Sequence, residues 1–179
     1  MGRRGRPLAE RALSYRAPGA THPDLERWPP TPGHLRYQRT VRIGAGEACW
    51  HATSSELMAW GVKTRSGFTV RPSDTGDRRV RLGERYWLVA RLGPVAVKEP
   101  VQVTAVVDQD DRRGFAYGTL AGHPVTGEEA FVVHRDADGT VFFTLRSITS
   151  PGDGWWRAAF PAVRVAQRVY RRRYLRALT

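Results

Sequence analysis

Residues 112–131 read RRGFAYGTLAGHPVTGEEAF and predict a β-hairpin. A run of aromatic and β-branched residues is followed by a loop that contains glycine and proline, and a second such run begins at the two glutamates. Alternate side chains of a strand lie on the same face, so Phe115 and Tyr117 share one face, and Glu129 and Phe131 share one face of the return strand. The hairpin therefore predicts a carboxylate beside aromatic rings, which requires either a cationic partner or a chemical role.

The first strand of this hairpin, GFAYGTL at 114–120, is close to the aromatic strand with which RNA-recognition motifs stack bases. The formal net charge of +12 makes that interpretation relevant. Two observations exclude it. The RNA motif alternates two helices with four strands, whereas residues 62–150 have no helical periodicity. In addition, Gly118 stands where that motif has an aliphatic residue.

The rest of the sequence predicts a strand, a helical stretch, a long series of strands and a final helix. Residues 35–43 alternate as a strand, and 46–60 predict one helix or two short ones with Gly61 as the C-cap. The region that follows predicts an antiparallel meander with strands at 68–71, 79–82, 85–92, 95–98, 101–108, 114–120, 128–134 and 140–148.

The C-terminal region predicts a long amphipathic helix. Residues 150–153 read SPGD, a capping-type sequence, and 154–178 have apolar residues at helical spacing with arginines between them. Because proline suits the first turn of a helix, Pro161 predicts that the long helix starts near it and that Trp155, Trp156 and Phe160 form a separate turn.

This order of elements resembles the helix-grip fold of the START-like and birch-pollen-allergen superfamily. We therefore expect an α+β fold in which a curved antiparallel sheet wraps the long C-terminal helix. The predicted organisation is a disordered basic tail at 1–14 and a single START-like domain at 15–179. A chain of 179 residues is long enough for one well-buried core.

Several short motifs also resemble the domain of unknown function 1990, or uncharacterised protein family 0548. They are GFAYGTL at 114–120, GHP at 122–124, GEE at 127–129, GAT at 19–21, RIGAG at 42–46, Trp60, and PAVR with QR in the last helix. The resemblance covers about residues 15–178. It implies a START-like fold and supplies no reaction from which residue roles could be transferred.

Composition limits the kinds of chemistry that the chain can support. Cys49 is the only cysteine, which excludes an intrachain disulfide and a cysteine-based zinc site. His51 lies two positions away, on another side of a helix, so Cys49 is better explained by core packing than as a nucleophile. The five histidines lack metal-ligand spacing and no nucleotide-binding fingerprint occurs, so we expect no metal and no cofactor.

The excess positive charge is almost entirely arginine and is scattered along the sequence, apart from clusters at 3–6 and 171–173. Such scatter favours a solvated surface over a nucleic-acid groove, and binding of nucleic acid or acidic lipid through the last helix is kept as a weaker alternative. No run of apolar residues is long enough for a signal peptide core or a transmembrane helix, so we expect a cytoplasmic protein.

The leading hypothesis is a module that binds a small apolar or amphipathic molecule in a cavity between the sheet and the last helix. Neighbouring strands supply apolar sets of the same period, namely Val101, Val103, Ala105 and Val107, and Val141, Phe143, Leu145 and Ser147. The residues expected to contact the ligand are Trp87, Phe115, Tyr117, Glu129, Phe131, Phe143, Trp156 and Tyr170.

The alternative is a small-molecule enzyme of the cyclase, hydrolase or isomerase type. Its general base would be Glu129 or Glu128, with His123 as proton relay and Tyr117 as a hydrogen-bond donor. The simpler interpretation is structural. At least one of the two glutamates is then solvated, an inward Glu129 pairs with an arginine such as Arg91 or Arg146, and His123 caps the turn.

Overall fold

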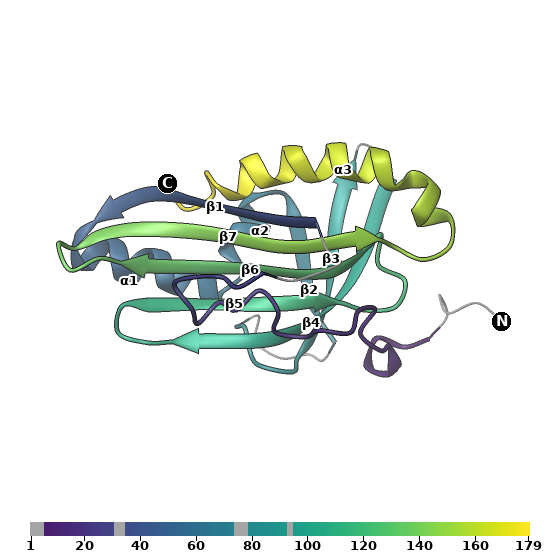
Figure 1. Cartoon of the computed structure of the whole chain (residues 1–179), viewed down its shortest axis with the longest axis horizontal. Helices are drawn as coiled ribbons and strands as arrows, with labels where there is room; N and C mark the ends of the chain where they lie inside the picture. Colours follow the sequence, from purple (N-terminus) through teal and green to yellow (C-terminus); the bar gives the residue numbers. More distant parts are fainter. Residues whose placement is uncertain (1–5, 31–34, 74–78, 93–94) are drawn as a thin grey trace.

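Seven antiparallel strands form one curved sheet, with the order β1-β7-β6-β5-β4-β3-β2 (Figure 1). The computed structural model describes residues 6–30, 35–73, 79–92 and 95–179. The strands are β1 (Leu35–Ala45), β2 (Phe68–Pro72), β3 (Arg85–Leu92), β4 (Val95–Asp108), β5 (Arg112–Thr119), β6 (Val125–Arg135) and β7 (Thr140–Pro151).

The helices lie on the concave side of the sheet, where they close one hydrophobic core. They are α1 (Gly46–Met58), α2 (Gly61–Arg65) and α3 (Trp155–Tyr174). Trp50 of α1 and Tyr174 of α3 belong to the same buried cluster as Phe131 of β6, and α3 extends along the sheet (Figure 1). This arrangement confirms the expected helix-grip fold. No helix in the described ranges is long and apolar enough to cross a membrane.

The predicted hairpin at 112–131 is present, and Tyr117 pairs with Glu129 in its ladder. Two details of the meander differ from the prediction. Residues 79–82 are not a strand, and the backbone N–H of Val80 binds the carbonyl of Met58. The predicted strands 95–98 and 101–108 are one strand, β4, in which Pro100 pairs with Trp87.

A β-bulge in β4 breaks the apolar set that alternation predicts for this strand. The register of β4 against β5 shifts between Val103 and Ala105. Val101 and Val103 therefore belong to the concave core, whereas Ala105 and Val107 lie outside that cluster. An extra residue on one strand inverts the alternation that follows it, which is why a period of two fails here.

The stretch between α1 and β2 was predicted incorrectly. Gly61 does not cap α1 but begins α2, and Trp60 adopts the left-handed conformation with φ of 64°. The Trp60 side chain is fully buried, with its ring centroid 4.8 Å from those of Tyr86 and Phe115. Burial of this large ring compensates for the unfavourable backbone conformation, and α2 starts immediately after it.

The C-terminal helix is continuous from Trp155 to Tyr174 and contains Pro161. The prediction of a separate turn before Pro161 was therefore wrong, since the helix accepts the loss of the one backbone hydrogen bond that proline cannot donate. The cap also differs, because Gly154 occupies the N-cap position and no side chain caps the helix.

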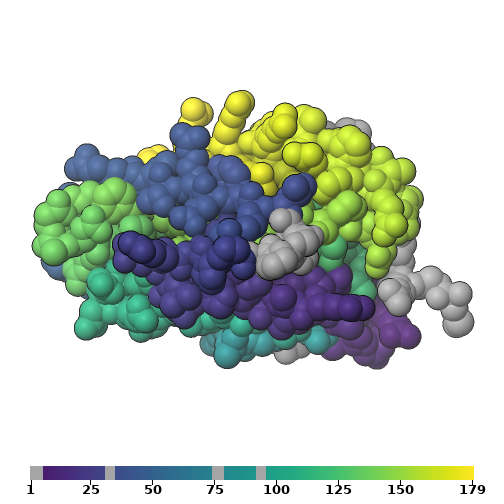
Figure 2. Space-filling model, in the orientation of Figure 1, coloured from purple at the N-terminus to yellow at the C-terminus, as the bar shows by residue number. Residues whose placement is uncertain are grey.

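The N-terminal segment packs on the convex face of the sheet. Residues 6–30 form a layer over the strands in Figure 2, where they are purple to indigo. A short 3₁₀ helix, Leu8–Glu10, starts this layer, and Leu13 forms an isolated antiparallel bridge with Leu120. Leu8 and Arg11 are buried, so part of the stretch for which the sequence predicts a disordered tail packs against the sheet. Residues 1–5 lie outside the described residues.

Candidate functional site

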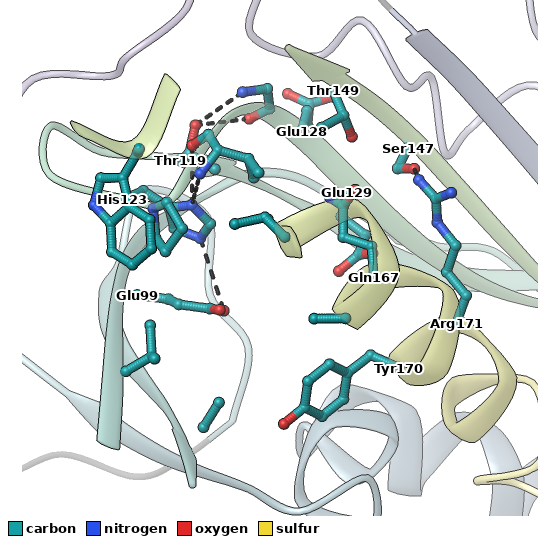
Figure 3. Close-up of a pocket in the computed structure, with 18 of the residues that line it drawn as sticks. Glu99, Thr119, His123, Glu128, Glu129, Ser147, Thr149, Gln167, Tyr170 and Arg171 are labelled. Carbon is teal, nitrogen blue, oxygen red and sulfur yellow. Dashed lines mark hydrogen bonds and ion pairs between the residues drawn. The ribbon is translucent and has the colours of Figure 1, made fainter. Parts of the chain in front are cut away.

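A cavity of about 360 Å³ lies between the concave face of the sheet and α3, a volume typical of small-molecule sites (Figure 3). The helix contributes the inward side chains of Ala162, Ala166 and Tyr170. The rest of the wall comes from α2, the strands and the β5–β6 loop, and includes Lys63, Phe68, Ala90, Val97, Glu99, Tyr117, His123, Glu129, Ser147 and Ile148.

A buried lysine organises the polar part of the cavity. The Nζ atom of Lys63 lies 2.9 Å from Oε2 of Glu129 and donates a hydrogen bond to the hydroxyl of Tyr174 at 2.7 Å. The hydroxyl of Tyr117 donates to the same carboxylate oxygen of Glu129. Burial and the neighbouring Glu129 charge raise the pKa values of Tyr117 and Tyr174 well above 10, so both tyrosines remain neutral.

Four aromatic rings surround the ammonium group of Lys63. Its Nζ atom lies 4.3 Å to 5.4 Å from the ring centroids of Tyr174, Phe68, Tyr117 and Phe131. Electrostatic attraction to the ring faces therefore adds to the ion pair with Glu129. No sequence pattern predicted a role for Lys63. Its rarity was the available signal, because Lys63 and Lys98 are the only lysines in this arginine-rich chain.

The ion pair corrects the arginine partners proposed for Glu129. Arg91 is exposed, and the buried Arg146 lies on the opposite face of the sheet. There Arg146 donates hydrogen bonds to the backbone carbonyls of Thr21, His22 and Glu26. Burial lowers the pKa of Arg146 to about 10, and its guanidinium holds the N-terminal segment on the convex face.

The carboxylate of Glu128 also lies on the convex face of the sheet. Its carboxylate is 2% exposed and accepts hydrogen bonds from the hydroxyl of Tyr15 at 2.5 Å, from Thr21 and Thr104, and from the backbone N–H of Gly19. The expectation that one glutamate of the pair is solvated was therefore wrong. The N-terminal segment covers the face on which Glu128 lies, whereas Glu129 points to the concave side.

His123 and Glu99 form a second polar pair on the wall opposite α3 (Figure 3). Nδ1 of His123 lies 2.9 Å from the carbonyl oxygen of Val125, a turn contact, and Nε2 lies 3.8 Å from Oε2 of Glu99. Burial lowers the pKa of His123 to about 3 and raises the pKa of Glu99 to about 7. The pair therefore joins a neutral imidazole to a carboxyl group that titrates near neutrality.

The two shifts have opposite effects on stability, which gives a pH test of this geometry. The lowered pKa of His123 makes the fold lose stability as pH falls from 6.5, and the raised pKa of Glu99 makes it lose stability as pH rises from 4.5. Between these values the two contributions oppose each other.

Glu99→Gln removes the contribution of Glu99 and leaves that of His123. On acidification from pH 6.5 to 4.5, the free energy of unfolding of this variant is expected to fall by about 2 to 3 kcal/mol relative to that of the original chain. His123→Gln should show the opposite slope over the same interval. Urea unfolding at a series of pH values measures both slopes. Parallel pH profiles for all three chains would contradict the assigned burial of the pair.

The other predicted contact residues occupy three different environments. Tyr117, Trp156 and Tyr170 line the cavity. Phe115, Phe131 and Phe143 belong to the buried core cluster and are not among the lining residues. Trp87 alternates with the core residues Tyr86 and Leu88, and Arg11 of the N-terminal segment lies 4.8 Å from its ring centroid. The structure therefore does not bring Trp87 to the cavity.

Other proposed chemistries find little geometric support. Among the described residues no group of His, Cys, Asp and Glu is arranged to hold a metal ion, and Cys49 packs against the core. In the arginine cluster at 171–173, Arg171 is turned inward, where it donates to Oγ of Ser147 at 3.0 Å and lies over the ring of Tyr37. Arg172 and Arg173 remain exposed, so nucleic-acid binding through this helix stays a prediction.

Comparison with known proteins identifies the family. The model of the domain of unknown function DUF1990 matches residues 14–177. A UPF0548 protein of Deinococcus radiodurans is 37% identical over 158 residues, which cover 83% of this chain and 79% of that protein. A UPF0548 protein of Arabidopsis thaliana is 25% identical over 146 residues, covering 78% and 69% of the two chains.

Solved structures share the fold at low sequence identity. The hypothetical protein jhp0584 from Helicobacter pylori matches with a TM-score of 0.60 and 13% identity, covering 85% of this chain and 92% of that one. Ara h 8.0201 matches with a TM-score of 0.50 and 11% identity, covering 82% and 99%. Together with the family match, these similarities show that the chain belongs to the DUF1990 (UPF0548) family and has a birch-pollen-allergen-like, START-like fold.

Proposed function

We propose that this protein binds a small amphipathic molecule in the cavity between the sheet and α3. The observation that carries the proposal is the cavity itself, with about 360 Å³ of space on the concave face. Its walls are apolar over α3 and polar around Glu99 and Lys63, which is the lining expected of a site that both buries and orients a ligand.

The composition of α3 supports this function. Ala159, Ala162 and Ala166 occur at the positions where the helix passes over the cavity. Large residues at these positions would fill the space, so the small side chains leave the cavity between the helix and the sheet open. The exposed face of the same helix has Val165 and Val169 among the arginines.

Filling the cavity from the helix is expected to weaken binding. In Ala166→Phe the ring enters the space, and the affinity for the neutral fluorophore N-phenyl-1-naphthylamine should fall by about tenfold or more. Ala158→Phe is the matched control, because Ala158 is exposed on α3 and is not among the lining residues. Fluorescence titration measures both affinities. Equal binding by the original chain and Ala166→Phe would place the fluorophore outside the cavity and contradict the proposal.

An enzymatic function has one specific observation in its favour. The neutral His123 beside Glu99 is suited to proton transfer, and its ring lies in the cavity wall. Glu129, in contrast, already binds Lys63 and Tyr117. It is therefore less available as a general base than the sequence predicts. An enzyme would need turnover that is lost in His123→Gln and kept in a variant outside the cavity. A ligand-binding protein would recover its ligand unchanged after incubation.

A further inference from the structure

Three polar groups face the cavity without partners of their own. In the described part of the chain, the carboxylate of Glu99 accepts no hydrogen bond, and its nearest charged neighbour is His123 Nε2 at 3.8 Å. The amide of Gln167 and the hydroxyl of Tyr170 also have no hydrogen-bond partner among the described residues. Figure 3 shows that Glu99 comes from β4, whereas Gln167 and Tyr170 come from α3 across the cavity. Groups on opposite walls that lack partners mark the place of a ligand's polar head.

The surrounding charges favour a cationic head. The positive charge of Lys63 is matched by Glu129 at 2.9 Å, and Arg171 is turned toward Ser147 and Tyr37. Among the described residues that line the cavity, Glu99 has no hydrogen-bond donor and no ion pair with Lys63 or Arg171, and its neighbour His123 at 3.8 Å is kept uncharged by burial. An ammonium head compensates the ionised carboxylate, an anionic head would repel it, and a neutral head would favour the protonated carboxyl group.

Three aromatic rings form the apolar wall near this place. The centroids of Phe68 and Tyr170 are 4.8 Å apart, and Tyr174 lies 6.2 Å from each of them. Phe68, Tyr170 and Tyr174 all line the cavity. Because Lys63 already lies over the rings of Phe68 and Tyr174, and Arg173 lies 5.4 Å from the centroid of Tyr170, these rings supply apolar surface for the body of a ligand and the carboxylate selects the charge of its head.

We propose that the ligand of this cavity is an apolar molecule with one basic amine, and that its ammonium group binds the Glu99 carboxylate between β4 and α3. This inference rests on the ligand-binding function proposed above. The primary or secondary ammonium donates to Glu99 and to the oxygens of Gln167 and Tyr170, while the apolar body lies against the alanines of α3.

Binding of an amine is then coupled to the proton on Glu99. The other titratable and charged groups among the residues that line the cavity are Lys63 from α2, His123 from the β5–β6 loop, Tyr117 from β5, Glu128 and Glu129 from β6, and Tyr170, Arg171 and Tyr174 from α3. Of these, Lys63 lowers the pKa of Glu99 and Glu129 raises it. An ammonium group lowers it further, so amine binding at neutral pH releases part of a proton and tightens as pH rises through about 7.

The test compares three probes that share one apolar body: phenylbutylamine, phenylbutanol and phenylbutyric acid. At about pH 8, where the carboxylate is ionised and the amine is still protonated, calorimetry is expected to show that the amine binds about tenfold or more tightly than the alcohol and the acid. Titrations at neutral pH in phosphate and in Tris should report release of about half a proton with the amine and none with the alcohol.

The variant Glu99→Gln keeps the shape and removes the charge, so it should bind the amine and the alcohol equally while its affinity for the alcohol is unchanged. Glu10→Gln, an exposed site outside the cavity, should keep the amine preference. If the alcohol binds as well as the amine, and Glu99→Gln changes neither affinity, the amine proposal fails and ligand binding stands. If the acid binds most tightly, the amine proposal is also overturned, and the polar head of the ligand is assigned to Lys63 and Arg171 instead. Failure of all three probes to bind, together with failure of N-phenyl-1-naphthylamine, refutes the proposed function itself.

Discussion

Replacing Lys63 by methionine is expected to lower the free energy of unfolding by about 3 to 5 kcal/mol, because Glu129 then stays buried without its cation. The change also removes the hydrogen bond to Tyr174 and the attraction to four ring faces. Methionine keeps the length and apolar volume of the lysine stem, so the loss reports the charge more than a cavity. Urea unfolding of the ligand-free protein measures the difference.

Two variants make this prediction specific. Lys98→Met removes the other lysine, which is exposed on β4, and is expected to change stability by less than about 0.5 kcal/mol. The double variant Lys63→Met/Glu129→Gln removes both charges and should be more stable than Lys63→Met alone, because no unpaired carboxylate remains. A Lys63→Met protein as stable as Lys98→Met would show that the ion pair contributes nothing.

Glu128→Gln is the second change with a large expected effect, about 3 to 4 kcal/mol. The carboxylate accepts hydrogen bonds from Tyr15, Gly19, Thr21 and Thr104. In glutamine the NH2 group replaces one of the accepting oxygens, so some of these donors lose their acceptor. Unsatisfied buried groups are costly, so the N-terminal segment is expected to detach in part. Trypsin should then cut after Arg11 and Arg16 more rapidly than in the original chain.

The control for this experiment is Glu10→Gln, which changes an exposed glutamate of the same segment. It should leave both the unfolding midpoint and the rate of proteolysis unaltered. Unchanged protection of Arg11 and Arg16 in Glu128→Gln would mean that the other contacts hold the segment, among them the Leu13–Leu120 bridge and the bonds from Arg146 to the carbonyls of His22 and Glu26.

The sequence predicts the sheet well because its signals are local. The hairpin around Phe115 and Tyr117, and the inward set that includes Phe131, follow from alternation and from glycine at the turns. The bulge after Val103 does not follow, since it depends on pairing with β5 rather than on residue type. The continuous α3 was missed because the rule against internal proline has exceptions that packing decides.

The candidate site was predicted only in part. Tyr117, His123 and Glu129 were identified from one hairpin, where residue types and strand period place them together. Lys63 and Glu99 come from α2 and β4, distant in sequence, and only the folded sheet brings them to the same cavity. The partners of Glu128 include backbone N–H groups of Gly19 and Thr21, and no pattern of side chains in the sequence predicts such partners.

Glu128 and Glu129 are joined by a single peptide group, yet one carboxylate is bound by the N-terminal layer and the other by Lys63. Pairing of β6 with both β5 and β7 fixes that peptide in the sheet and keeps the two carboxylates on opposite faces. A chain without residues 6–30 would leave the Glu128 carboxylate without the donors of Tyr15, Gly19 and Thr21, on a face of the sheet that is then uncovered. The layer on the convex face therefore stabilises the strand that carries Glu129 on its other face, and versions of the protein that lack residues 6–30 are expected to unfold more easily.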